Sequence, residues 1–321
     1  LAVYCANRTF TLLAALVLSG CFVIPMNRDY TGPKLRPAEL VEYYSPPSST
    51  IELQHSEQLR SAREFSVERL IFQTDVGEMK VDYYRRGESS DDLIFVFPVL
   101  GGRKNMIANY FADYFARNGF DAAIVHRDES IKKPENLDRL EDILRKSVMR
   151  DQLAIDYFEQ HMGKRDFGTF GISRGGVNVA ISAGVDPRLK YNIIAMGGSA
   201  IAKLFRDSDE RRIRRFRESV MRDRQMSEDA LFEYIDQQIR TDPKNLAQYI
   251  DARDAMVILS LFDSTVPIEY GKKLREEMGK PETIYLIADH RTSALYTQFI
   301  TLLPPGPPGL CNGLFPIDYI E

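Results

Sequence analysis

Short apolar runs alternate with amphipathic stretches of helical spacing from about residue 66 to residue 303, and this pattern limits the possible fold more than any other feature of the sequence. Two short β-rich runs around a turn at 75–77 predict a hairpin before the alternation begins. The alternation itself predicts a mostly parallel central sheet with helices on both faces, an α/β fold. The expected strands are 70–72, 79–84, 93–97, 122–125, 167–172, 191–196, 256–262 and 283–288, and the expected helices are 106–117, 137–161, 174–184, 267–279 and 293–303.

The segment 200–250 interrupts this alternation, because it contains polar, helix-forming sequence without a strand pattern. We expect a helical insertion that lies over one end of the sheet as a lid. Its arginines allow two interpretations. They form a cationic face for an anionic substrate or lipid headgroups, or they belong to a solvated helix in which acidic neighbours balance their charge. The arginines are Arg211, Arg212, Arg214, Arg215 and Arg217, and the acidic neighbours are Asp207, Asp209, Glu210 and Glu218.

The pentapeptide 171–175, GISRG, lies directly after an expected strand and directly before an expected helix. It has the pattern G-x-S-x-G, which places a serine on a sharp strand-to-helix turn. Gly171 and Gly175 leave room for the chain to reverse there, and Gly176 allows the helix to approach the sheet closely. Ser173 is therefore the candidate nucleophile.

Two further segments carry a resemblance to the α/β-hydrolase superfamily, in which the chain order is Ser, then Asp or Glu, then His. Asp263 follows an expected strand in 263–267, DSTVP, and resembles the family's acid. His290 follows the last expected strand in 287–290, IADH, and resembles the family's histidine. The resemblance covers about residues 66–303 and implies a catalytic triad of Ser173, Asp263 and His290. A serine hydroxyl needs such a base to accept its proton, and the carboxylate orients the base.

Other residues compete for two of these roles. Asp289 is a rival acid, but adjacent residues rarely face each other, and Asp207 and Asp209 are further alternatives within the insertion. His126 ends an expected strand but precedes the serine in the chain, and His161 ends an expected helix. Both histidines fit a structural or solvated position better than the position of the base.

The resemblance also implies two backbone N–H groups that stabilise an oxyanion. One belongs to Arg174, the residue after the nucleophile. The other belongs to the loop 98–103, where many relatives have His-Gly and this chain has Pro-Val, so the donor is Leu100 or Val99, with Leu100 favoured. Arg103 and Arg174 lie near the expected mouth of the site, but arginine side chains at that place can also point into solvent.

Residues 1–20 resemble an export signal. They contain one charge, Arg8, and then an apolar run at 10–18 that is much shorter than the roughly 20 residues needed to span a bilayer. The run ends in 18–21, LSGC, which resembles the bacterial lipobox, where cleavage precedes a lipid-modified cysteine. This predicts a lipid on Cys21. The alternative is a buried N-terminal helix with an incidental cysteine.

Several expectations follow from the lipoprotein interpretation. Lipid on Cys21 would anchor the chain in the bacterial cell envelope, and Phe22 in place of Asp favours the outer membrane. Residues 21–65, rich in Pro, Ser and Tyr, would form the lipidated N-terminus and a tether, and 304–321 an extended C-terminal tail. Cys311 would then be left without an internal disulfide partner.

The sequence also limits the class of function. A net charge of −4 gives no global indication of nucleic-acid binding, and the histidines, cysteines and acids show neither metal-ligand spacing nor a dinucleotide fingerprint, so no cofactor and no metal is expected. The pattern favours an exported, lipid-anchored serine hydrolase that cleaves a small-molecule carboxylic ester through an acyl-enzyme. A peptidase or acyltransferase with the same site, or a binding protein without turnover, are the alternatives. The sequence leaves the acyl and alcohol groups and the oligomeric state open.

Overall fold

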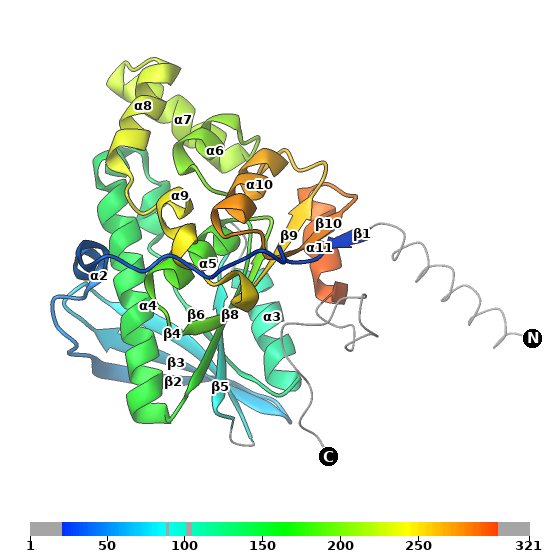
Figure 1. Cartoon of the computed structure of the whole chain (residues 1–321). Helices are drawn as coiled ribbons and strands as arrows, with labels where there is room; N and C mark the ends of the chain where they lie inside the picture. Colours follow the sequence, from blue (N-terminus) through cyan, green and yellow to red (C-terminus); the bar gives the residue numbers. More distant parts are fainter. Residues whose placement is uncertain (1–20, 88–89, 101–104, 301–321) are drawn as a thin grey trace, which may run out of the picture.

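The computed structural model describes residues 21–87, 90–100 and 105–300, and these residues form one ten-stranded sheet in the order β1-β10-β9-β8-β7-β5-β6-β4-β3-β2 (Figure 1). The central six strands pair in parallel, in the order β10-β9-β8-β7-β5-β6. At one edge β1 pairs antiparallel with β10, and at the other edge β4, β3 and β2 follow β6 in antiparallel pairing. The strands are β1 (Cys21–Ile24), β2 (Glu52–Ser61), β3 (Phe65–Gln73), β4 (Met79–Arg86), β5 (Asp92–Phe97), β6 (Asp121–Val125), β7 (Asp166–Ile172), β8 (Leu189–Ala195), β9 (Ala255–Ser260) and β10 (Glu282–Leu286).

Helices cover both faces of the sheet because its central strands are apolar on both sides. In β5, the side chains of Phe95 and Phe97 pack in the cluster with α4 (Leu140–Met162), α5 (Arg174–Val185) and α10 (Ile268–Glu277). Those of Ile94 and Val96 pack in the opposite cluster with α3 (Met106–Arg117) and α11 (His290–Ile300). The alternation of side chains along a strand explains why the continuous apolar run is buried on both faces.

The predicted fold class is confirmed. The hairpin expected at the front is β3 and β4, and each strand and helix expected between 93 and 303 has an observed counterpart. The boundaries differ by a few residues, as at α4, which begins at Leu140 after the 3₁₀ turn η3 (Pro134–Arg139). The mostly parallel sheet covered by helices on both faces follows from the pattern of the sequence.

The insertion is helical, as predicted, and lies beside α4 and α5 (Figure 1). It contains α6 (Ile201–Asp207), α7 (Arg211–Arg224), α8 (Glu228–Gln238) and α9 (Pro243–Leu246). Its apolar side chains, among them Phe216 and Leu231, join Leu140 of α4 and Ile181 of α5 in one buried cluster. The insertion therefore has a core that is continuous with that of the sheet domain.

The N-terminal segment differs from the predicted tether. β1 pairs with β10, with Cys21 opposite Leu286, and the Phe22 ring stacks on Tyr285 at a centroid distance of 4.9 Å. The segment continues along the domain to α2 (Ala38–Tyr44), whose Tyr44 is buried, and then to β2, which pairs with β3. The physical reason is that β10 and β3 would otherwise be unpaired sheet edges, which these strands cover. Residues 21–61 therefore belong to the folded domain.

Other expectations lie outside the described residues: the export signal at 1–20, the loop glycines and Arg103 at 101–103, Cys311, and the C-terminal tail at 304–321. Within the part of the chain that is described, no helix has both the length and the apolarity needed to cross a membrane.

Arg36 offers a test of how the N-terminal segment is held. Its guanidinium donates from Nε to the Gly184 carbonyl and from Nη2 to the Ala183 carbonyl, both at 2.9 Å, at the C-terminal end of α5. We expect Arg36→Met to lower the free energy of unfolding by about 1–2 kcal/mol, because it leaves two terminal carbonyls without this donor. Arg28→Met, at an exposed position of the same segment, is the control and should change little. Equal urea midpoints for the two variants would contradict this contact.

Candidate active site

Ser173 lies on the turn between β7 and α5, where the backbone has a rare conformation. Its φ of 59° and ψ of −122° fall in a region that residues with a side chain seldom adopt. The Ser173 N–H donates to the Ala195 carbonyl of β8 at 2.9 Å, and its carbonyl accepts the Val177 N–H of α5 at 3.0 Å. The turn is thus held by bonds to the sheet and to the helix, and it places the serine at the carboxyl end of the central strands.

Glycines make this turn possible because there is no room for a Cβ atom around it. A Cβ on Gly171 would lie 2.3 Å from the backbone C and O of Gly175. A Cβ on Gly175 would lie 2.4 Å from the Phe97 carbonyl oxygen at the end of β5. On Gly176, it would lie 2.9 Å from the carbonyl oxygen of Ala195. The absence of side chains at these three glycines therefore allows the N-terminus of α5 to pack directly against the ends of β5, β7 and β8.

The structure brings Asp263 and His290 together. Asp263 follows β9 and His290 begins α11, and His290 Nδ1 lies 2.6 Å from Asp263 Oδ2. The second oxygen, Asp263 Oδ1, accepts the backbone N–H groups of Thr265 and Val266 at 2.9 and 2.8 Å. Only 2% of the Asp263 side chain and 14% of the His290 side chain are exposed. The carboxylate is fixed on both oxygens, and it in turn fixes the orientation of the imidazole.

Two backbone contacts hold the loops that carry these residues next to each other. Leu261 N donates to the Leu286 carbonyl at 2.9 Å, and Phe262 N donates to the Ala288 carbonyl at 3.1 Å. These bonds continue the pairing of β9 and β10 beyond the ends of the strands. The hydrogen bond between the acid and the histidine therefore follows from the register of two adjacent parallel strands.

The rival acids have other partners. Asp289 is exposed and accepts the backbone N–H groups of Arg291 and Thr292, so it caps the first turn of α11. Asp207 accepts the hydroxyl of Tyr270, and Asp209 accepts that of Thr265 at 2.9 Å. The described contacts of these carboxylates are structural.

The rival histidines also lie apart from the serine. His126 Nε2 is 2.9 Å from Asp82 Oδ2, and Arg69 donates two hydrogen bonds to the same carboxylate. The His161 ring stacks on Tyr157 at a centroid distance of 4.9 Å. Neither His126 nor His161 lines the cavity that contains Ser173.

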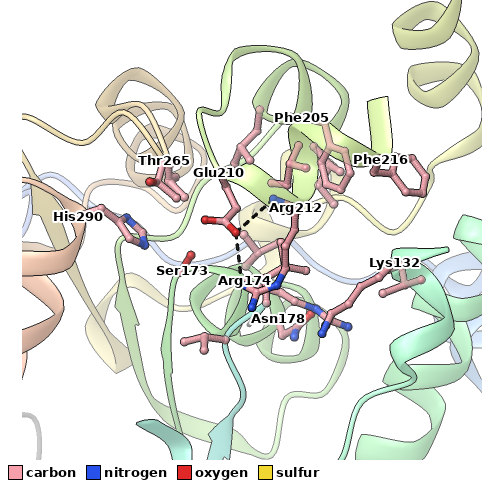
Figure 2. Close-up of a pocket in the computed structure, with 18 of the residues that line it drawn as sticks. Lys132, Ser173, Arg174, Asn178, Phe205, Glu210, Arg212, Phe216, Thr265 and His290 are labelled. Carbon is pink, nitrogen blue, oxygen red and sulfur yellow. Dashed lines mark hydrogen bonds and ion pairs between the residues drawn. The ribbon is translucent and has the colours of Figure 1, made fainter. Parts of the chain in front are cut away.

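A cavity of about 860 Å³ opens in front of the serine, and Ser173 and His290 both line it (Figure 2). Val99 and Leu100, the candidate oxyanion donors from the loop after β5, lie at its wall, as does Arg174. The insertion supplies the opposite wall. Most of the other lining side chains are apolar: Ile107, Ile131, Leu140, Leu144, Ile172, Val177, Ile201, Leu204, Phe205, Ile213, Phe216, Ile239, Val266, Ala294 and Leu295.

Basic groups are the main polar feature of this cavity. Lys132, from the 3₁₀ turn η2 (Glu129–Lys132), Arg174 from α5 and Arg212 from α7 all line it (Figure 2). Arg215 of α7 and Arg291, the residue after His290, line it as well. Burial, together with the positive charges of Arg174 and Arg212, lowers the pKa of Lys132 to about 8. Burial, with a smaller contribution from the positive charge of Arg127, also lowers the pKa of Arg174, to about 10. Of these groups, Arg174 is the most buried, with 13% of its side chain exposed, whereas 55% of the Arg212 side chain is exposed.

Comparison with solved structures identifies the fold. Acetyl xylan esterase 1 from Thermoanaerobacterium sp. JW/SL YS485 superposes with a TM-score of 0.60 at 18% sequence identity, over 86% of this chain and 98% of that one. An acetyl xylan esterase from Paenibacillus sp. R4 matches with a TM-score of 0.57 at 14% identity, over 84% and 100% of the two chains. The chain has the α/β-hydrolase fold.

Further comparisons set the limits of this assignment. An acylaminoacyl peptidase from Pyrococcus horikoshii shares the α/β-hydrolase fold with a TM-score of 0.52 at 16% identity, over 73% of this chain and 38% of that one. No protein-family model matches the chain, and no curated protein matches it in sequence. The chain therefore shares its fold with these enzymes at low sequence identity.

Sequence reasoning did not identify two polar residues of the cavity, Lys132 and Asn178. Lys132 lies in the loop region after β6, where no motif marks it. Asn178 lies four residues after Arg174 on α5, so helical spacing places it on the same face of the helix as Arg174. That spacing was the only signal in the sequence for either residue.

The close approach at the serine turn generates a test within this hydrolase fold. We expect Gly171→Ala to lower the free energy of unfolding by about 3 kcal/mol or more, because its Cβ would overlap the Gly175 backbone, which cannot move aside cheaply. Gly87→Ala is the matched control, since the nearest atom to its Cβ, the Glu64 carbonyl oxygen, is 3.9 Å away. Denaturant unfolding measures both. Similar losses in the two variants would show that the turn tolerates a side chain.

Proposed function

We propose that the protein is a serine hydrolase that cleaves carboxylic esters through an acyl-enzyme intermediate. The observation that carries this proposal is the shared cavity of Ser173 and His290, in which the histidine is bound through Nδ1 to the buried Asp263. Nucleophile, base and orienting acid are the three parts that this chemistry needs. They stand in the chain order Ser, Asp, His, which is that of the α/β-hydrolase triad.

The contacts assign a role to each residue. Because Nδ1 of His290 faces Asp263, Nε2 is free to accept the proton of the Ser173 hydroxyl as its Oγ attacks the ester carbonyl carbon. The imidazolium that forms is stabilised by the Asp263 carboxylate, and it then protonates the departing alcohol. In the second half of the reaction, His290 takes a proton from water, which attacks the acyl carbon on Ser173. The imidazolium then returns this proton to Ser173 Oγ as the bond from Oγ to the acyl carbon breaks and the acid leaves.

The negative charge on the carbonyl oxygen needs donors during both steps. The N–H of Arg174 lies in the first turn of α5, where helix N–H groups have no partner within the helix. Leu100 lies at the wall of the same cavity and supplies the second N–H in this proposal. A donor of this kind typically stabilises the transition state by about 3–4 kcal/mol.

Two features favour esters as the substrate class. The cavity wall is mostly apolar, so it fits an acyl chain or a small alcohol better than an extended polar peptide. Two structural neighbours whose chains are matched over nearly their whole length are named as acetyl xylan esterases. Only 38% of the peptidase chain is matched. We therefore place ester hydrolysis before peptide hydrolysis and acyl transfer.

The triad assignment predicts how variants behave. Ser173→Ala should reduce hydrolysis of a 4-nitrophenyl ester by at least about a thousandfold and abolish labelling by a fluorophosphonate probe, because the probe reacts only with an activated serine. Asp263→Asn should reduce the rate by a similar factor, because the imidazole loses its orienting carboxylate. Intact mass and steady-state rates measure both effects.

Asp289→Asn is the matched control, since this exposed acid adjoins His290 and caps α11. It should retain labelling and most of the activity. A folded wild-type protein that the probe does not label would count against the proposed function, and Asp289→Asn losing as much activity as Asp263→Asn would reassign the acid.

We also propose that Cys21 carries lipid and anchors the protein in the bacterial cell envelope, at the outer membrane. The support is the order of residues 10–21, an apolar run that ends in LSGC. Cleavage before Cys21 would leave the described domain whole. A small-molecule ester is then the substrate of a membrane-anchored enzyme, and no nucleic acid takes part.

Metabolic labelling tests the anchor. In a bacterial host, the wild-type chain should take up an alkyne-bearing palmitate analogue and fractionate with the outer membrane, whereas Cys21→Ser should lose the label and appear in the soluble periplasmic fraction. Cys311→Ser is the control and should keep the label. Label that persists in Cys21→Ser would contradict this site of attachment.

A further inference from the structure

The cavity has two chemically different ends on either side of Ser173. His290 lies on one side of the serine, and Lys132, Asn178 and Arg212 lie on the other, with Arg174 between them and the serine (Figure 2). We call Lys132, Arg174, Asn178 and Arg212 the basic end of the cavity. They come from η2, α5 and α7, so the insertion contributes to this end together with the sheet domain.

The positive charge of the basic end is only partly neutralised. Glu129 is an ion-pair partner of Lys132 and also of Arg174, at 3.5 Å from Arg174 Nη1, but 63% of its side chain is exposed and it does not line the cavity. Glu210 lies 3.3 Å from Arg212 Nη1 and itself lines the cavity (Figure 2), so it neutralises Arg212 within the cavity. Among the described residues, these three cations pair with two carboxylates, and Arg215 of α7, which has no described ion pair, also lines the cavity, so positive charge is in excess. Exposed pairs of this kind contribute little stability.

Asn178 supplies the second, independent observation. It is only 8% exposed, it lines the cavity, and its Nδ2 has no hydrogen-bond partner among the described residues. A buried donor left without a partner destabilises a fold, because it has lost its hydrogen bond to water. One helical turn separates Asn178 from Arg174, so the two side chains lie on the same face of α5, and both line the cavity.

We propose that the substrate is an ester whose acyl chain ends in a carboxylate, and that this carboxylate binds at the basic end. The excess of positive charge, reached along a mostly apolar wall, matches an anion at the end of an apolar chain. This inference rests on the proposed function, because it takes Ser173 as the point where the acyl group attaches.

The geometry of the reaction places the acid group on the acyl side. The leaving alcohol must lie next to His290, which protonates it, so the acyl chain extends in the opposite direction, toward the basic end. Asn178 lies five residues beyond Ser173, about 7–8 Å along the axis of α5 at the helical rise. A spacer of several methylene groups along the apolar wall connects the two points.

A pair of substrates tests this specificity. 4-Nitrophenyl hydrogen octanedioate and 4-nitrophenyl octanoate have the same leaving group and chain length and differ by the terminal carboxylate. We expect the wild-type protein to give the higher kcat/KM with the octanedioate. Lys132→Gln should lower the octanedioate-to-octanoate ratio of kcat/KM at least tenfold, mainly through KM. Lys133→Gln removes the same charge at the next, exposed position and should leave the ratio unchanged.

Asn178→Leu separates binding from stability. The leucine has the same branched arrangement of side-chain heavy atoms and removes a buried donor that has no partner among the described residues, so the melting temperature should change little. The octanedioate-to-octanoate ratio should nevertheless fall several-fold. A ratio that stays at the wild-type value would remove Asn178 from the site.

The pH dependence follows from the charge of Lys132. Its pKa of about 8 means that the lysine is protonated below that pH and neutral above it, so the ratio should be highest below pH 8 and decline as the pH rises through this value. Lys132→Gln should remove the decline. The charged groups that face Lys132 are Glu129 on its own turn, Arg174 on α5, and Arg212 with Glu210 at the start of α7.

The outcomes distinguish the two proposals. If the fluorophosphonate labels Ser173 and the wild type cleaves both esters with an octanedioate-to-octanoate ratio of kcat/KM near one, ester hydrolysis stands and the carboxylate specificity is wrong.

If neither ester is cleaved and no label appears, the proposed function fails, and the basic end is then tested by binding. Octanedioate should raise the melting temperature of Ser173→Ala, and Lys132→Gln in that background should abolish the shift. No shift in Ser173→Ala overturns the inference.

Discussion

The approach of α5 to the carboxyl ends of β5, β7 and β8 is the constraint on which the rest of the site depends. Backbone atoms meet there at distances that leave no space for a Cβ at Gly171, Gly175 or Gly176. This contact accompanies the unusual backbone angles of Ser173 and brings the first turn of α5, with Arg174, to the wall of the cavity. The energetic cost of the turn is offset by the large cores on the two faces of the sheet, so the strain is held by the whole domain.

The insertion is tied to the acid loop as well as to the core. Ser208 Oγ donates to the Thr265 carbonyl at 2.6 Å, and Asp209 N donates to the Ser264 carbonyl at 3.1 Å. These contacts join the connection between α6 and α7 to the residues that follow Asp263. A movement of α7 would therefore act on two parts of the cavity at once, the basic end through Arg212 and the histidine through the loop that holds its carboxylate.

Much of the fold could be predicted from the sequence because the relevant signals are local. The run 93–97 is apolar at every position, as a strand buried on both faces requires, and the GISRG motif places its serine between a strand and a helix. The N-terminal segment could not be predicted in this way, because β1 is stabilised by pairing with β10, more than 250 residues away in the chain. The basic end likewise combines η2, α5 and α7, and no spacing along the chain relates Lys132 to Arg212.

The pairing of β1 with β10 also has a consequence for where the reaction would take place. Cys21 lies opposite Leu286, and Leu286 precedes His290 by four residues. An anchor on Cys21 would therefore be joined directly to the sheet, without a flexible linker. His290, the histidine of the proposed triad, would stay within roughly 15 Å of the lipid attachment point at strand-like spacing. An enzyme held in this way samples only the thin layer of solution next to the bilayer. Its effective substrate would be whatever ester collects in that layer, even where the same compound is scarce in the bulk.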